Sequence, residues 1–347
     1  MAETVRMEIT SASILRAILL VLFFVFLYLL KGVIIIFLFA LVIASAISPF
    51  ANWLDRKGFP RVIGVLLLYL LVIGLGVFIL SLIIPYISDD IRRLTGTFPT
   101  VVERVSSTLE GAQAHSPQYL DFLGEIQNIL SGLSSWIQQA SQSVFGLVAS
   151  IFGGVFSFFA ILIISFYLSV TRRGIESFLG SVVPEKYESY VFGLWKRAEV
   201  KVGKWLQSQL LLALIVGLLT YIGLSLLGIK YALILSLLIM VLELVPMVGP
   251  IIAAIPAVFL AFIQSPSLGI WVIILYVFIQ QLENHILVPI IFGKTLNLNP
   301  VVVIIALLVG QQLAGIPGMI LAVPVSTIIV EMLDDIARQK ESRRSTS

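Results

Sequence analysis

Long apolar runs separated by short polar segments make up most of the chain. The first three apolar runs cover residues 14–30, 33–53 and 62–84. Each is close to the roughly 20 residues that a membrane-spanning helix needs. Lys31 and Gly32 separate the first two runs, and this pair suits a tight turn between antiparallel helices. The pattern therefore predicts an N-terminal three-span region over residues 1–84 that begins with a helical hairpin.

The pattern becomes polar between residues 85 and 143, where acidic residues outnumber arginines. Apolar residues recur there at spacings of three and four on both sides of a breaker at residues 112–117, which is the period of an amphipathic helix. We predict an antiparallel helical hairpin on the non-cytoplasmic side. Its apolar stripes would pack on each other or contact another subunit.

A fourth apolar run at residues 144–170 predicts a further span, and a loop rich in basic residues follows at 171–205. The positive-inside rule places this loop in the cytoplasm. Within it, Pro184 can begin a helix that has Trp195 and Trp205 on one apolar face and basic residues around it. This arrangement predicts an amphipathic helix that lies in the membrane interface as an anchor.

Residues 206–332 contain the longest apolar blocks, and two of them carry helix breakers near their centres. The blocks at 231–263 and 300–332 are each too long for one ordinary span. Proline removes a backbone donor, and a helix break in lipid is tolerated only where protein or water covers it. The residues predicted to break these helices are Pro246, Gly249, Pro250 and Pro256 in the first block and Gly315, Pro317 and Gly318 in the second.

Two topologies fit the basic tail at residues 333–347, which favours a cytoplasmic C-terminus. In one, every apolar block crosses the membrane, which gives eight spans. In the other, 231–263 and 300–332 are re-entrant hairpins from opposite faces, and only 268–291 between them crosses. The block lengths and central breaks favour the second. Both describe an all-α polytopic membrane protein with about six to eight transmembrane helices, two broken or re-entrant segments, one extramembrane hairpin and cytoplasmic termini.

Composition supports a membrane protein and excludes several kinds of site. Of 347 residues, 59% are hydrophobic and 12% charged, against about 45–50% and 25% in soluble domains. There is no cysteine, and the two histidines are too few to suggest a zinc site. The net charge of +3 is spread over loops and does not form a nucleic-acid patch. We predict no metal, no cofactor and no nucleic-acid partner, and we expect the first span to remain as an anchor rather than to be removed as a signal peptide.

Polar residues inside the apolar core are the candidates for chemistry. Glu243 directly precedes the first break, and an acid at membrane depth is a functional hypothesis by default. Helical spacing groups a second set of polar residues on the next block, with His285 on the opposite side. Amides donate and accept hydrogen bonds without the desolvation cost of a charge, so they suit an uncharged polar solute such as a polyol or furanone. The predicted substrate-binding residues are Glu243, Gln280, Gln281, Glu283, Gln311 and Gln312.

The two breaks share a few matching residues, which are either a short internal repeat or a chance match between apolar, small-residue segments. A shift of 68 residues aligns 252–256 with 320–324 and sets Glu243 against Gln311. Paired broken helices that face a midplane site are a recurrent transporter design.

Several motifs in the second half resemble those of the AI-2E family of bacterial transporters, which is named for export of the quorum-sensing signal autoinducer-2. The stretches that carry the resemblance are residues 217–223, 227–233 and 245–250 and several short motifs within 280–324, among them Gly315-Ile316-Pro317-Gly318 and Ala322-Val323-Pro324. The resemblance implies a multi-span inner-membrane protein that moves small solutes outward, in a homo-oligomer for which relatives suggest a pentamer. Some members are associated with sodium/proton exchange.

Three functions remain open from the sequence. The first is gradient-driven export of a small polar solute, and the second is cation/proton antiport with Glu243 or Glu283 titrating. The third is a non-transporting membrane scaffold that works through the hairpin at 85–143. An enzyme is not expected, because the chain has no HExxH, GxSxG or phosphate-loop motif.

Overall fold

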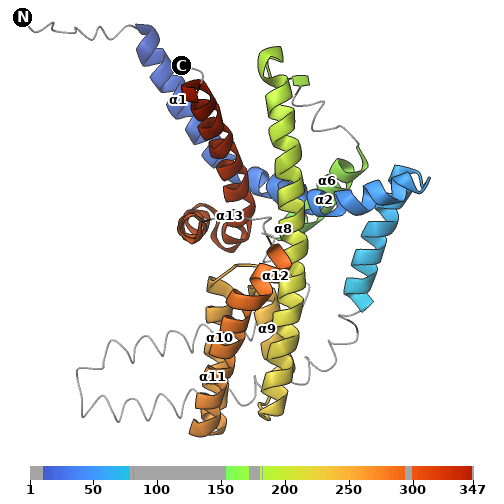
Figure 1. The fold of residues 1–347 in the computed structure, drawn as a ribbon, viewed down its shortest axis with the longest axis vertical. Coiled ribbons are helices and arrows are strands. Elements are labelled where there is room, and N and C mark those ends of the chain that lie inside the picture. Colours follow the sequence, from blue (N-terminus) through green and yellow to red (C-terminus); the bar gives the residue numbers. More distant parts are fainter. Residues whose placement is uncertain are drawn as a thin grey trace, which may run out of the picture.

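The computed structural model describes residues 11–78, 81, 154–171, 180–181, 183–293 and 299–345. Every regular element among these residues is helical, which confirms the all-α fold class (Figure 1). The first elements are α1 (Ser11–Leu29), α2 (Lys31–Arg56), an unlabelled helix at Arg61–Phe78, and α6 (Val155–Val170). The later elements are α8 (Glu185–Leu226), α9 (Ala232–Leu242), α10 (Val248–Gln264), α11 (Pro266–Leu282), a π-helical turn η2 (Glu283–Leu287), α12 (Val288–Phe292) and α13 (Pro300–Ser345). The hairpin predicted at 85–143 lies outside the described residues.

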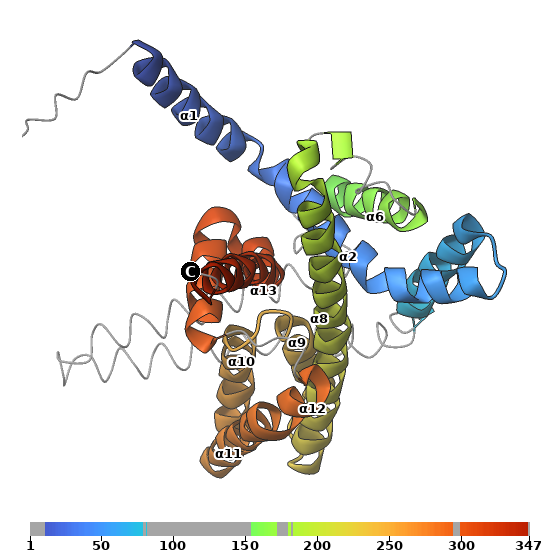
Figure 2. The same cartoon turned by 45° about the horizontal axis from the view of Figure 1, so that its top comes forward.

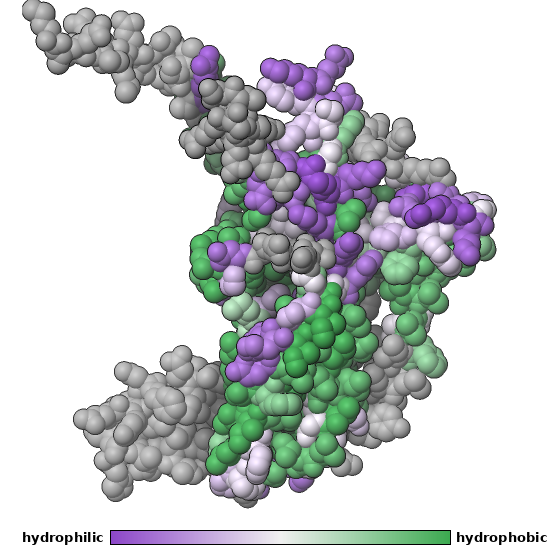
Figure 3. All heavy atoms as spheres, viewed as in Figure 1, coloured by the Kyte–Doolittle hydropathy of each residue, from purple (hydrophilic) through white to green (hydrophobic). Residues whose placement is uncertain are grey.

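Much of the outer surface is apolar. Among the described residues, the helices long and apolar enough to cross a membrane are Lys31–Arg56, Arg61–Phe78, Glu185–Leu226, Pro266–Phe292 and Pro300–Ala337. Large side chains such as Leu214 of α8 and Trp271 and Phe278 of α11 are more than half exposed. Figure 3 shows hydrophobic residues gathered over the α8–α11 end of the molecule, with hydrophilic residues toward the other end of α8. An apolar surface of this extent needs lipid around it, so the chain is a multi-pass membrane protein.

Helix α8 lies against helices from both halves of the chain. It contacts α2, α9, α11, α12 and α13. Its 42 residues extend about 63 Å, roughly twice the thickness of a bilayer's hydrocarbon core. Helix α8 runs without interruption through residue 205, so the predicted amphipathic segment and the span that follows it form one helix. Trp205 is 1% exposed, so its ring packs inside the protein and does not anchor the chain in the interface.

The hairpin predicted from Lys31 and Gly32 is also wrong. Backbone hydrogen bonds from Leu30 N to Phe26 O and from Ile34 N to Leu30 O, both 3.0 Å, continue the helical pattern from α1 into α2. Gly32 does not adopt the positive φ that a tight turn uses. Figure 2 shows α1 extending away from the rest of the molecule rather than folding back along α2.

Helices α2 and α8 cross at very short range. A Cβ atom on Gly203 would lie 2.3 Å from the carbonyl oxygen of Ser45, so only glycine fits there. Beside this contact, Nε2 of Gln207 donates to the carbonyl oxygen of Ala46 at 2.6 Å. This crossing ties the N-terminal helices to α8.

Both predicted breaks are present. The run at 231–263 is divided into α9 and α10, which contact each other and are joined by a short turn (Figures 1 and 2). Helix α13 is interrupted at Gly315, where φ is 63° and ψ is −140°. Each break therefore separates two helical arms: α9 and α10 at the first break, and the parts of α13 before and after Gly315 at the second.

Candidate functional site

The first break is a turn of five residues, Glu243 to Met247, between α9 and α10. Met247 has a φ of 67°, which is rare for a residue with a side chain and reverses the chain direction. A Cβ atom on Gly249 would lie only 1.8 Å from the carbonyl oxygen of Leu242. Glycine at this position therefore allows α10 to start directly against the end of α9.

Of the predicted breakers in this block, Pro246 lies in the turn and Pro250 in the first turn of α10. Pro250 occupies a position where the missing N–H costs no helical hydrogen bond. Pro256 lies inside α10, and the helix continues through it. The prediction that Pro256 marks a break is therefore wrong.

Two glutamates meet at this turn. Glu243 is completely buried and Glu283 is 5% exposed. Their carboxyl groups are close enough to interact electrostatically, although the residues lie 40 positions apart in sequence. Both oxygens of Glu243 and Oε2 of Glu283 have no hydrogen-bond partner among the described residues. The arrangement is a buried carboxyl pair with spare acceptor oxygens.

Neighbouring polar groups hold the pair in position. Nε2 of Gln209, on α8, donates to the backbone carbonyl oxygen of Glu243 at 2.5 Å and so fixes the turn. The side chain of Gln280 lies close enough to Glu283 to interact with its carboxyl group. Glu283 also begins the π-helical turn η2, a rare element that often occurs at functional sites.

The other predicted site residues on α11 and η2 do not join this pair. Gln281 is exposed, and its carbonyl oxygen lies 3.0 Å from Nδ1 of His285. His285 is exposed as well, on the opposite side of the helix from the buried Glu283. The helical spacing thus correctly separates Glu283 from His285.

The remaining predicted residues, Gln311 and Gln312, lie in the first arm of α13 and are exposed. Among described residues, the structure does not bring either amide to the carboxyl pair. Instead, Gly310 and Gly318 face each other across the second break, where a Cβ on Gly318 would lie 2.0 Å from the carbonyl oxygen of Gly310. Of the predicted breakers in the second block, Gly315 alone has non-helical φ and ψ, whereas Pro317 and Gly318 lie in the helical arm that follows it.

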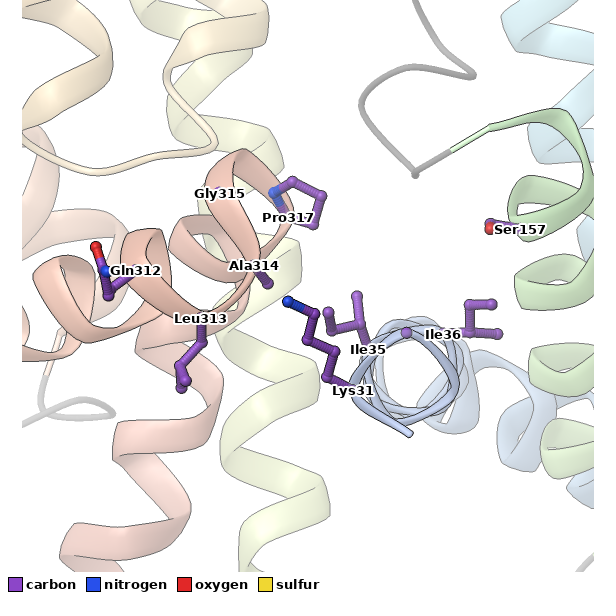
Figure 4. A pocket seen from close by; sticks show the side chains of 10 residues that line it. Lys31, Ile35, Ile36, Ser157, Gln312, Leu313, Ala314, Gly315 and Pro317 are labelled. Carbon is purple, nitrogen blue, oxygen red and sulfur yellow. The ribbon is translucent and has the colours of Figure 1, made fainter. Parts of the chain in front are cut away.

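A pocket of about 490 Å³ lies between this second turn and the start of α2 (Figure 4). Lys31 extends toward Ala314 and Gly315, and Ser157 of α6 lies on the far side. The residues that line it are Lys31, Gly32, Ile35, Ile36, Ser157, Gln312, Leu313, Ala314, Gly315 and Pro317. Lys31 was not among the residues that sequence reasoning selected, although it is the single charged residue between Arg16 and Asp55.

A charged cluster joins α8 to the second arm of α13. Nε of Arg197 donates to Oε1 of Glu331 at 2.8 Å, and the same guanidinium also pairs with Asp335. Lys201 pairs with the other oxygen of Glu331. These ion pairs hold the second arm of α13 against α8.

The two turns offer different chemistry. The buried carboxyl pair can hold a proton, or another cation, because two adjacent ionised carboxylates away from water are strongly unfavourable. The pocket at the second turn presents a cation and an amide beside apolar side chains, so it suits a ligand with both a polar and an apolar part.

Comparison with known proteins agrees with this architecture. The family model described as "AI-2E family transporter" matches residues 17–338. The Bacillus subtilis protein named "Putative transport protein YueF" is 30% identical over 299 residues, which cover 84% of this chain and 80% of YueF. The Bacillus subtilis "Putative transport protein YrrI" is 27% identical, covering 89% and 88% of the two chains.

The Escherichia coli protein named "AI-2 transport protein TqsA" is 26% identical over 312 residues, which cover 88% of this chain and 86% of TqsA. The similarity to these relatives and the family match both extend over nearly the whole sequence, including both breaks. The chain therefore belongs to the AI-2E family and is a membrane transporter.

Proposed function

We propose that this transporter exports a small polar solute from the cell and couples export to proton entry through the Glu243–Glu283 pair. The observation that carries the proposal is the buried carboxyl pair at the turn between α9 and α10, with three oxygens unpartnered among the described residues. Ionisable residues inside a membrane protein are costly and commonly serve proton or ion pathways. We place the protein in the inner membrane with both termini in the cytoplasm.

The cargo class rests on a separate argument. One relative, TqsA, is named as an AI-2 transport protein. A solute of that class is small, polar and rich in hydroxyl groups, and amide side chains such as Gln280 can bind hydroxyl groups without a charge. Gln280 lies beside Glu283, so a solute bound at Gln280 would change the surroundings of the proton site.

The carboxyl pair could instead exchange a proton for a metal cation, because unpartnered carboxylate oxygens also bind cations. The two functions differ in what must be present on each side of the membrane. A solute exporter moves protons only when solute moves. A cation/proton antiporter moves protons in response to a cation gradient alone.

The deciding experiment uses the purified full chain in proteoliposomes, with solute release and internal pH followed together. We expect autoinducer-2 release to accelerate when the side that receives the solute is made acidic. Glu243→Gln and Glu283→Gln should each lower this proton-dependent release about tenfold or more, because an amide cannot carry the proton.

The matched control is Glu199→Gln, which removes a partly buried glutamate that accepts a hydrogen bond from Ser48 on α2. It should retain proton-dependent release. If release in Glu243→Gln and Glu283→Gln keeps the wild-type proton dependence, the coupling role is wrong. Proton flux that needs only a sodium or potassium gradient would favour the antiporter instead.

A further inference from the structure

Lys31 is a cation in strongly apolar surroundings. It is the first residue of α2, a helix long and apolar enough to cross a membrane. No other charged residue occurs between Arg16 and Asp55. Lys31 lies at the junction of two apolar helical segments, and a lysine in such surroundings extends its ammonium group toward polar groups such as lipid phosphates.

The ammonium group of Lys31 has no carboxylate partner among the described residues. It lies 4.6 Å from the centre of the Tyr28 ring, a cation–π contact. An aromatic face attracts the charge but leaves most of the three N–H donors of the ammonium group available. The group therefore has the capacity to bind an anion at the pocket that it lines.

Two helix ends add to the positive field at this pocket. Ser157 lies in the first turn of α6, and Gly315 immediately precedes the second arm of α13. The first turn of a helix carries partial positive charge from its backbone N–H groups. These ends reinforce Lys31.

The rest of the lining is apolar. Ile35 and Ile36 come from α2, while Leu313, Ala314 and Pro317 come from the turn of α13 (Figure 4). A free inorganic anion gains nothing from such side chains, whereas a lipid would place its acyl chains against them. The volume of about 490 Å³ is large enough for a head group with the adjoining glycerol.

We propose that this pocket binds the phosphate of an anionic membrane phospholipid, with Lys31 as the principal contact. The bound lipid then bridges α2 and the turn at Gly315, two segments far apart in sequence. This site carries the opposite charge to the Glu243–Glu283 pair. Lipid binding at this site can be measured without any transport assay, so the test does not depend on the proposed transport activity.

The test measures thermal unfolding of the purified full chain in neutral detergent during titration with phosphatidylglycerol. We expect phosphatidylglycerol to raise the Tm of the wild type and phosphatidylcholine to raise it less, because choline offsets the phosphate charge. Lys31→Gln should weaken the apparent Kd for phosphatidylglycerol about tenfold, since it removes one charge-assisted contact. Lys31→Arg should retain most of the effect.

Lys186→Gln is the matched control, because Lys186 is also exposed and also lies over a tyrosine ring, at 5.5 Å from that of Tyr187. It should bind phosphatidylglycerol as the wild type does. Equal stabilisation of Lys31→Gln and wild type would overturn the site. Stabilisation by inorganic phosphate alone, with the same dependence on Lys31, would overturn a lipid as the ligand. If the Tm of Lys31→Gln without added lipid is close to that of the wild type, the variant is folded.

Discussion

At the scale of single residues, each of the two turns depends on a few particular residues. Glu243 is buried at the first turn beside Glu283, and Lys31 lines a pocket at the second. Between them, glycines allow backbones to touch where a methyl group would not fit. The proposed function rests on the carboxyl pair. The glycines allow the close backbone contacts of the turns, and the first of these turns positions the pair.

Replacing Gly249 by alanine tests this closure. The new Cβ atom would overlap the carbonyl oxygen of Leu242, so the end of α9 must move away from α10. We expect a loss of about 1–3 kcal/mol in the free energy of unfolding, the usual range for overpacking a tight site. Unfolding in detergent with a chemical denaturant measures it.

The control for that variant is Gly74→Ala in the helix at Arg61–Phe78. Nothing lies within 4 Å of a Cβ atom at Gly74. Alanine in an open helical position should be neutral or stabilising by up to about 1 kcal/mol. Equal effects of the two substitutions would contradict the close contact at Gly249.

At the scale of elements, α8 and α13 are joined by charges. Glu331 accepts from both Arg197 and Lys201, so the clamp is a small network rather than an isolated pair. Both basic side chains are more than one-third exposed, and solvent therefore weakens each interaction.

A charge exchange measures the strength of this clamp. Lys201→Glu and Glu331→Lys should each destabilise the protein, because each brings like charges together. The double variant should recover about 1 kcal/mol relative to the sum of the single variants. Thermal unfolding of all four proteins provides the comparison.

Lys204→Glu serves as the reference change on the same helix, since Lys204 is exposed and forms no ion pair with a described residue. It should have little effect on the Tm and should not be rescued by Glu331→Lys. A double variant no more stable than its worse parent would mean that the clamp contributes nothing in solution.

At the scale of the whole molecule, we propose that transport moves the α9–α10 hairpin relative to α8. Met240 of α9 lies against Gly217 of α8, where a Cβ on the glycine would be 3.0 Å from that of Met240. This spacing is slightly shorter than the usual Cβ–Cβ distance of a disulfide, about 3.5–4.5 Å, so a small shift allows a bond. The chain has no native cysteine that could compete.

We expect the double variant Gly217→Cys/Met240→Cys to lose transport when oxidised and regain it on reduction. Flux in proteoliposomes before and after a reducing agent gives the result. Each single cysteine variant should be insensitive to the redox state. Undiminished flux through a fully cross-linked protein would show that α8 and α9 move as one body.

The helical class and both breaks are predictable from the sequence, because proline and glycine are local signals in an apolar run. A lone acid in such a run is a local signal as well and makes Glu243 a candidate. Sequence reasoning also proposed Glu283, but the proximity of Glu243 and Glu283 depends on how α10 packs against both α9 and α11, and no local sequence signal predicts that packing. Gln209 was missed for the same reason, since its partner is a carbonyl oxygen on another helix. The pair Lys31-Gly32 was interpreted as a turn, whereas the helical hydrogen bonds continue into α2.

The carboxyl pair also has an electrical consequence. If it carries one proton inward for each neutral solute that leaves, one positive charge enters the cell per cycle. A membrane potential of 100 mV, negative inside, then supplies about 2.3 kcal/mol to each cycle. That energy alone corresponds to a roughly forty-fold solute ratio across the membrane. Under the proposed coupling, the buried pair of Glu243 and Glu283 would make the export of an uncharged molecule sensitive to voltage.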